Sequence, residues 1–278
     1  MSRTMTVACV QIAAGADTDG NLARLDELID EAAGRSAQLI GLPEYATCYG
    51  MIDGRLEVGA QPEETHPALA HLTGAAQRTS TWLLVGSLAI ARPDGRIFNR
   101  TYLLGPDGTV RARYDKIHLF DVDLAGGESY RESATIAPGG RAVIADLGTC
   151  RLGLSICYDL RFPQIYAALA KAGADILTIP AAFTRKTGRA HWHVLARARA
   201  IETGAFVFAP CQTGEQADGR LARFGHSLIV SPWGEILAEA GEEEGVITAA
   251  LDLDAVSAAR RMIPALQHGR AFTIAEIA

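Results

Sequence analysis

Residues 153–163 read GLSICYDLRFP, which predicts a buried strand, a tight connection at Cys157 and a helix that opens at Pro163. A junction of this kind exposes a side chain above the edge of a sheet and aims backbone N–H groups at whatever that side chain attacks. A free cysteine is often a small buried hydrophobe instead, so this stretch alone leaves both interpretations of Cys157 open. Ser155 falls inside the strand and not at the bend, and we interpret it as structural.

Outward from this stretch, short apolar runs alternate with segments of helical spacing. Two Pro-Asp-Gly turns, at residues 93–95 and 106–108, join three strands in a meander, so the sheet that holds them is not purely parallel. Residues 121–140 predict a long polar loop, and loops of that length are usually functional or disordered. The helical spacing predicts helices at residues 21–33, 66–78, 163–172 and 190–203. The apolar runs predict strands at residues 7–12, 38–42, 82–90, 97–104, 143–146, 152–156, 176–179, 206–210, 227–230, 236–238 and 246–251.

The number of elements limits the fold class. About a dozen strands and at least four helices do not fit into one flat sheet. Two sheets packed face to face, with helices outside, would bury both faces of each sheet. The sequence shows no linker, low-complexity tract, repeat or shift in composition, so we predict one α/β domain over residues 1–278, with its core at about 5–255.

Composition narrows the class of protein. The 278-residue chain is 49% hydrophobic and 21% charged, as expected for a globular protein, and its net charge of −6 argues against nucleic-acid or anionic-membrane binding. Met1–Ile12 lacks the features of a signal peptide, and no apolar run reaches the roughly 18 residues that span a bilayer, which favours the cytoplasm. The five cysteines share no CxxC spacing, so free thiols are expected.

Two further residues at predicted strand ends are suited to catalysis. Glu44 follows Pro43, which cannot continue a central strand, so Glu44 should lie at the carboxyl end of the strand at 38–42. Lys116 closes the meander within an aromatic and apolar segment. Each residue alone is also compatible with an ordinary surface charge. Together with Cys157 they supply a base, a cation and a nucleophile, the three groups that amide hydrolysis through a thioester needs.

These segments resemble the nitrilase superfamily of carbon–nitrogen hydrolases, from about Val7 to Arg270. The resemblance rests on motifs at residues 42–44, 115–119, 155–163 and 225–227. It implies a four-layer α-β-β-α sandwich that acts without a cofactor or metal. It also implies a homodimer or higher homo-oligomer assembled through helices, with the tail at 256–278 near the interface.

The same resemblance implies a role for each site residue. Cys157 would be the nucleophile, Glu44 the general base and Lys116 the cation at the oxyanion. The backbone N–H of Tyr158 would assist Lys116, and Glu132 would orient Lys116 or the substrate.

Within the superfamily, the sequence resembles the amidases of deaminated glutathione and of ω-amides, on residues 118–123, 180–184, 187–192, 197–203 and 263–268. It departs from their pattern at Gly204 and Gly269. The expected substrate is a small amide that bears a carboxylate, with N-carbamoyl amino acids and nitriles as alternatives on the same triad. Arginine can bind a carboxylate bidentately. The residues expected to contact the substrate are Arg185, Lys186, Arg189, Phe183 and Thr184.

Three other functions are compatible with parts of the sequence. His191 and His193 form an H-x-H pair, but on the predicted helix at 190–203 their side chains diverge by about 200°, which argues against a shared metal ion. His226 could pair with Cys157 as in papain-like enzymes, but Lys116 and Glu44 would then have no role. A non-enzymatic binding scaffold would predict a broken triad, and all three residue types are present.

Overall fold

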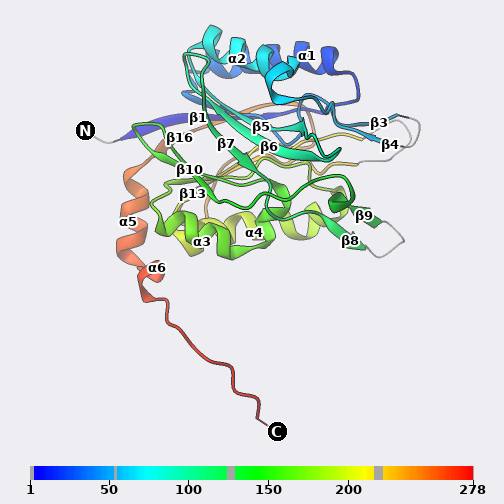
Figure 1. Ribbon diagram of the computed structural model, residues 1–278. Helices are drawn as coiled ribbons and strands as arrows, with labels where there is room; N and C mark the ends of the chain where they lie inside the picture. The colour runs from blue at the N-terminus through cyan, green and yellow to red at the C-terminus, as the bar shows by residue number, and fades with distance from the viewer. Residues whose placement is uncertain (1–2, 53–54, 124–128, 216–221, 278) are drawn as a thin grey trace.

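The computed structural model describes residues 3–52, 55–123, 129–215 and 222–277. These residues form two six-stranded sheets packed face to face, with helices on the outer faces (Figure 1). The first sheet has the order β16-β1-β2-β5-β6-β7, and the second has the order β10-β11-β12-β13-β14-β15. The predicted α-β-β-α sandwich is therefore confirmed.

The strands of the two sheets have the following bounds. The first sheet contains β1 (Thr4–Gln11), β2 (Leu39–Gly41), β5 (Trp82–Ala91), β6 (Ile97–Leu104), β7 (Val110–Asp115) and β16 (Gly245–Asp252). The second contains β10 (Val143–Asp146), β11 (Arg151–Leu154), β12 (Ile176–Thr178), β13 (Phe206–Ala209), β14 (Leu228–Val230) and β15 (Ile236–Glu239). Two short hairpins stand apart from both sheets, β3 (Gly50–Ile52) with β4 (Arg55–Glu57) and β8 (Asp121–Asp123) with β9 (Ser129–Arg131).

Two helices cover the outer face of each sheet (Figure 1). The first sheet is covered by α1 (Thr18–Gly34) and α2 (Pro67–Thr79), and the second by α3 (Pro163–Lys171) and α4 (Arg185–Thr203). The chain then passes through α5 (Asp254–Met262) and α6 (Ala265–His268), and its last residues extend away from the sandwich (Figure 1). Short 3₁₀ helices are η1 (Glu63–Thr65), η2 (Glu132–Ala134) and η3 (Cys157–Arg161).

Successive side chains of β1 pack into two different hydrophobic cores. Val7 and Cys9 pack between the sheets, against residues such as Leu228 on β14. Ala8 and Val10 point the other way and pack under α1 and α2. Successive side chains of a strand point to opposite faces, so a strand buried on both faces is apolar throughout.

Parallel pairing brings the carboxyl ends of neighbouring strands to the same edge of each sheet. β2 lies between β1 and β5 and is parallel to both. In the second sheet, β12 is likewise parallel to β11 and β13. The predicted meander is confirmed, because β5, β6 and β7 pair antiparallel in sequence order.

Two expectations about local structure were wrong. The helix predicted at 190–203 begins five residues earlier, at Arg185, with the Thr184 side chain as its N-cap. Gly188 obscured this start, because glycine disfavours helix. A Cβ at this position would lie 2.3 Å from the Phe224 ring, so packing requires glycine there. Residues 121–140 are not one loop, because they contain β8, β9 and η2.

Among the helices that the structure describes, none combines the length and apolarity needed to cross a bilayer.

Candidate active site

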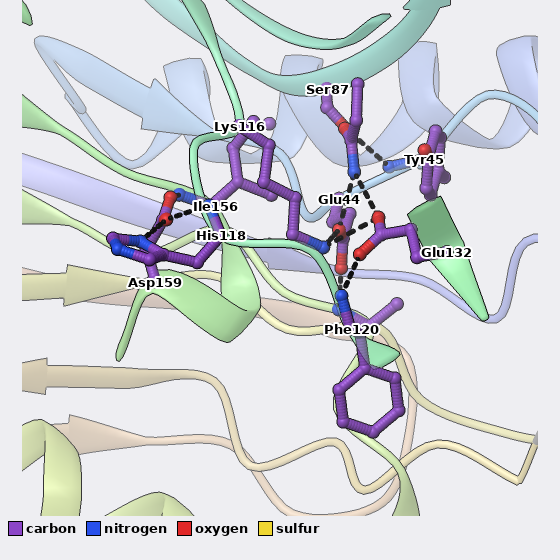
Figure 2. A network of polar contacts seen from close by, with 12 residues as sticks. Glu44, Tyr45, Ser87, Lys116, His118, Phe120, Glu132, Ile156 and Asp159 are labelled. Atoms are coloured by element: carbon purple, nitrogen blue, oxygen red, sulfur yellow. Dashed lines mark hydrogen bonds and ion pairs between the residues drawn. The ribbon is translucent and has the colours of Figure 1, made fainter. Parts of the chain in front are cut away.

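One buried ammonium group lies between two carboxylates. Lys116 Nζ donates to Glu44 Oε1 at 2.9 Å and to Glu132 Oε1 at 2.9 Å (Figure 2). Lys116 is 2% exposed and Glu44 is 4% exposed. Buried charges are stable only when paired and hydrogen-bonded, and here each charge meets a partner of opposite sign.

Glu44 is held by groups from both sheets. Its Oε1 also accepts from Asn99 Nδ2 on β6 at 2.8 Å, and its Oε2 accepts from the Ala182 N–H, beyond β12, at 2.9 Å. The Glu44 carbonyl oxygen accepts from Gln212 Nε2 at 2.8 Å. Contacts from both sheets therefore fix this carboxylate in position and orientation.

Glu132 is fixed by the backbone that precedes the β8–β9 hairpin. Its Oε2 accepts from the Phe120 N–H at 2.6 Å, and its Oε1 lies 3.4 Å from Asn99 Nδ2 in addition to Lys116 (Figure 2). Both oxygens therefore have donors, and the carboxylate holds Lys116 together with Glu44.

Cys157 occupies a strained turn. It begins η3, separated by two residues from the end of β11 at Leu154, with a φ of +46°. Its N–H donates to the Pro180 carbonyl at 2.9 Å. A left-handed backbone is uncommon for a residue with a Cβ, and such strain gathers at functional sites. The predicted junction exists, but a 3₁₀ turn separates Cys157 from the helix at Pro163.

Asp159 supports this turn and was not singled out from the sequence. It is fully buried, and its oxygens accept from the Ile156 N–H at 2.9 Å, the Tyr114 hydroxyl at 2.6 Å and the His118 N–H at 3.0 Å (Figure 2). The available signal was an acid inside an apolar motif, since a buried carboxylate needs several donors.

Electrostatics couple the thiol to its neighbours. Burial raises the pKa of the Cys157 thiol well above its ordinary value; the charge of Glu44 raises it further, and the charge of Lys116 opposes both. Burial by itself lowers the pKa of Lys116, but the charges of Glu132 and Glu44 outweigh that effect and raise it well above its ordinary value. These directions favour the protonated thiol of Cys157 and the charged ammonium of Lys116 in the resting site.

A cavity of about 300 Å³ brings these groups together. Its wall combines Glu44, Lys116, Glu132 and Cys157 with aromatic rings and a further cation. The lining residues are Glu44, Tyr45, Tyr49, Leu56, Lys116, Phe120, Tyr130, Arg131, Glu132, Thr135, Ile136, Cys157, Tyr158, Ala182, Phe183, Thr184 and Thr187.

The chain matches the family model described as carbon-nitrogen hydrolase over residues 6–261. It belongs to the carbon–nitrogen hydrolase family. The expected membership of the nitrilase superfamily is thereby confirmed, as is the expectation of an amidase-type hydrolase of carbon–nitrogen bonds.

Similar proteins share nearly the whole chain. A deaminated glutathione amidase of Synechocystis is 41% identical over 268 residues, covering 94% of this chain and 96% of that protein. The human omega-amidase NIT2 is 35% identical, covering 95% of this chain and 94% of that protein. The crystal structure of Saccharomyces cerevisiae Nit3 is 29% identical with a TM-score of 0.81, covering 94% of each chain. That of the C. elegans NitFhit protein is 32% identical with a TM-score of 0.88, covering 96% of this chain and 65% of that one.

Within this carbon–nitrogen hydrolase, the residues expected to contact the substrate fall into two groups. Phe183 and Thr184 line the cavity, whereas Arg185, Lys186 and Arg189 do not. Arg185 Nη1 instead pairs with Glu215 Oε2 at 2.6 Å. The three basic residues belong to α4, which begins at Arg185 and presents Thr187 to the cavity, so its other faces point elsewhere.

Arg131 lines the cavity and carries a permanent positive charge, but it was not among the residues expected from the sequence. It ends β9, directly before Glu132, and its guanidinium pairs with Asp123 at 2.7 Å. Its position next to Glu132 in the sequence was the available signal. The hairpin that places it in the cavity wall was expected to be a loop.

The histidines lie outside the cavity wall. His226 Nδ1 lies 2.8 Å from Glu239 Oε1 and is not among the lining residues, so it does not pair with Cys157. His191 and His193 diverge on α4 as expected: His191 Nδ1 lies 3.2 Å from Arg161 Nη1, and His193 Nε2 lies 2.8 Å from Glu239 Oε1.

Proposed function

We propose that this carbon–nitrogen hydrolase cleaves a small, carboxylate-bearing amide, with Cys157 as nucleophile, Glu44 as general base and Lys116 at the oxyanion. The observation that carries the proposal is the buried Glu44–Lys116–Glu132 arrangement, which lines one cavity with Cys157. It supplies every group that acyl transfer through a thioester requires.

The first half-reaction forms the thioester. Cys157 Sγ attacks the amide carbonyl carbon while its proton passes to Glu44; because the thiol pKa is raised, attack and proton transfer belong together. Lys116 Nζ and the Tyr158 N–H stabilise the negative oxygen of the tetrahedral intermediate. The carbon–nitrogen bond then breaks, and Glu44 returns the proton to the leaving ammonia or amine.

The second half-reaction releases the acid. A water molecule enters after the amine departs, and Glu44 takes one of its protons as the water oxygen attacks the thioester carbonyl. Lys116 again stabilises the oxyanion. Collapse of this intermediate breaks the carbon–sulfur bond, and Glu44 returns the proton to Cys157. Glu132 holds Lys116 in position throughout, because its second oxygen is anchored on the Phe120 N–H.

The substrate class follows from the cavity and from the relatives. A volume of about 300 Å³ suits a small molecule. Arg131 lines the cavity, and its guanidinium, which pairs with Asp123 in this structure, would exchange that partner for the substrate carboxylate. The similar proteins are named for amides of this kind, deaminated glutathione and ω-amides. We therefore propose a short acid with an amide at its far end as substrate.

Assays of ammonia and amine release test the proposal. The substrates are an ω-amide of a keto acid, deaminated glutathione, an N-carbamoyl amino acid and a nitrile, each given to wild type, Cys157→Ala and Cys9→Ala. The last variant is the control, because Cys9 is a buried thiol between the sheets. We expect Cys157→Ala alone to lose turnover of the amides. Retained turnover in Cys157→Ala, or a preference for the nitrile, would overturn the proposal.

We also propose a cytoplasmic homodimer or higher homo-oligomer. Val194 and Ile201 project from α4 with exposed fractions of 68% and 54%, and Trp233 lies near them at 53%. Large exposed apolar side chains that gather on one face often mark protein interfaces. The tail adds the exposed Phe272 and Ile274. Light scattering during size-exclusion chromatography should give a mass of two chains or more for wild type and a lower mass for Val194→Glu.

A further inference from the structure

A second cluster of chemically active side chains lies outside the cavity. His193 on α4, His226 before β14 and Glu239 at the end of β15 each offer one ligand atom, and these atoms all lie within 4.8 Å of one another. None of the three lines the cavity that holds Cys157. The proposed catalytic mechanism gives them no role.

The donor set and its spacing match a zinc-type ion. Two imidazole nitrogens and one carboxylate oxygen are a known ligand set for Zn²⁺, which leaves a fourth position for water. His193 Nε2 and His226 Nδ1 each lie 2.8 Å from the same oxygen, Glu239 Oε1. Around a tetrahedral ion with bonds of about 2.0–2.1 Å, such atoms are separated by about 3.3–3.5 Å. Each N–O separation would therefore open by about half an ångström, and the two nitrogens, which lie within 4.8 Å of each other, would come to the same separation of about 3.3–3.5 Å.

The surrounding packing holds the two imidazoles in place. The Phe224 ring stacks on His226 with a centroid distance of 4.4 Å and meets the edge of His193 at 5.8 Å. The backbone of His226 is tied on both sides, since its N–H donates to the Gly241 carbonyl at 3.0 Å and its carbonyl accepts from Trp192 Nε1 at 2.7 Å. A site on rigid, packed elements needs little reorganisation to bind an ion.

Access and charge also suit an ion. The side chains of His193, His226 and Glu239 are 32%, 23% and 34% exposed, so an ion can enter from solvent. Neutral imidazoles and a carboxylate are the protonation states that a metal ion requires.

We propose that His193, His226 and Glu239 form a binding site for a divalent transition-metal ion of the zinc class. The ion would tie α4 to the β14–β15 ladder, where Glu239 pairs with Leu228. Because α4 also carries Thr187 in the cavity wall, the site would brace that wall from outside. Its role is structural, and it is separate from the reaction at Cys157.

The experiment is metal binding to the full chain, with any affinity tag removed. The Cys157→Ala background removes the thiol that lines the cavity, which would otherwise compete for the ion. Titration calorimetry with Zn²⁺, the absorption spectrum with Co²⁺ and the thermal midpoint with and without Zn²⁺ are the readouts. We expect one ion per chain, nitrogen and oxygen ligation in the Co²⁺ spectrum, and a higher midpoint with Zn²⁺.

Two single variants in this background locate the ion. His193→Gln keeps a side-chain donor toward Glu239 but removes a ligand, so we expect affinity to fall by at least about tenfold, the lower end of what loss of an outer-shell partner costs. His191→Ala is the matched control, because His191 lies on the same helix and contacts Arg161 instead. The proposal is overturned if no ion binds at 1 mM Zn²⁺ (about the upper limit of a useful Kd), or if the two variants bind equally well.

Discussion

Replacing Glu132 by Gln tests how the ammonium of Lys116 is held. The carboxylate accepts from Lys116 on one oxygen and from the Phe120 N–H on the other. An amide has one accepting and one donating end. If its oxygen faces Lys116, its NH₂ group opposes the Phe120 N–H; if it is flipped, the NH₂ group opposes Lys116. Neither orientation satisfies both donors.

The magnitude follows from these contacts. The Glu132 side chain is 13% exposed, so water gives little relief. One buried donor left without an acceptor costs about 1–3 kcal/mol, which corresponds to a loss of roughly 2–10 °C in the thermal midpoint of a chain of this size. A displaced Lys116 would no longer reach the oxyanion, and loss of one such donor lowers kcat by about 10²–10³-fold.

The assay combines steady-state kinetics on the preferred amide with a thermal melt. Glu27→Gln is the control, since Glu27 makes a surface pair with Arg24 and its side chain is 68% exposed. Such pairs contribute about 0–1 kcal/mol, and kcat should not change. A folded Glu132→Gln enzyme whose kcat stays within about threefold of wild type, against the expected 10²-fold loss, would refute the positioning role.

Three further outcomes are expected. Arg131→Ala should raise KM for the carboxylate-bearing amide roughly tenfold or more, because a charge-assisted contact of about 1.5–3 kcal/mol is lost. Arg185→Ala should leave KM unchanged, and equal effects in the two variants would contradict the assignment. Gly86→Ala would place a Cβ 2.1 Å from the Leu42 carbonyl oxygen. We expect denaturant unfolding to show a loss of stability of about 1–3 kcal/mol or more. We also expect steady-state kinetics to show a lower kcat, because the strand that leads to the general base would shift. Burial raises the pKa of the Cys211 thiol to about 12. As the pH rises, the unfolded chain therefore loses the Cys211 proton before the folded chain does. The contribution of this thiol to stability is complete below about pH 9 and falls by about 1.4 kcal/mol per pH unit above it. Unfolding at pH 8 to 10 under reducing conditions should show a shallower decline in Cys211→Ala, and identical slopes would argue against this burial effect.

The sequence alone determined most strands of the two sheets, the four covering helices apart from the start of α4, and the candidate catalytic residues. Apolar runs located the strands, and Pro43 placed Glu44 just beyond the end of one of them. These signals are local, because strand propensity, helix spacing and the missing N–H of proline depend on neighbouring residues. The junction at Cys157 pointed to a candidate nucleophile in the same way, whereas the α-β-β-α fold was inferred from the number of elements and from the family resemblance.

Only the tertiary structure decided which side chains meet. Lys116 and Glu44 are 72 residues apart, and Asp159 reaches Tyr114 across 45 residues. Arg131, and not Arg185, lines the cavity. Arg131 lies on a hairpin where a loop was expected, and Arg185 belongs to α4, which begins earlier than expected. His193, His226 and Glu239 meet from three separate elements. Such partnerships depend on strand register, helix rotation and packing between layers, and these are properties of the assembled chain that no short window of sequence contains.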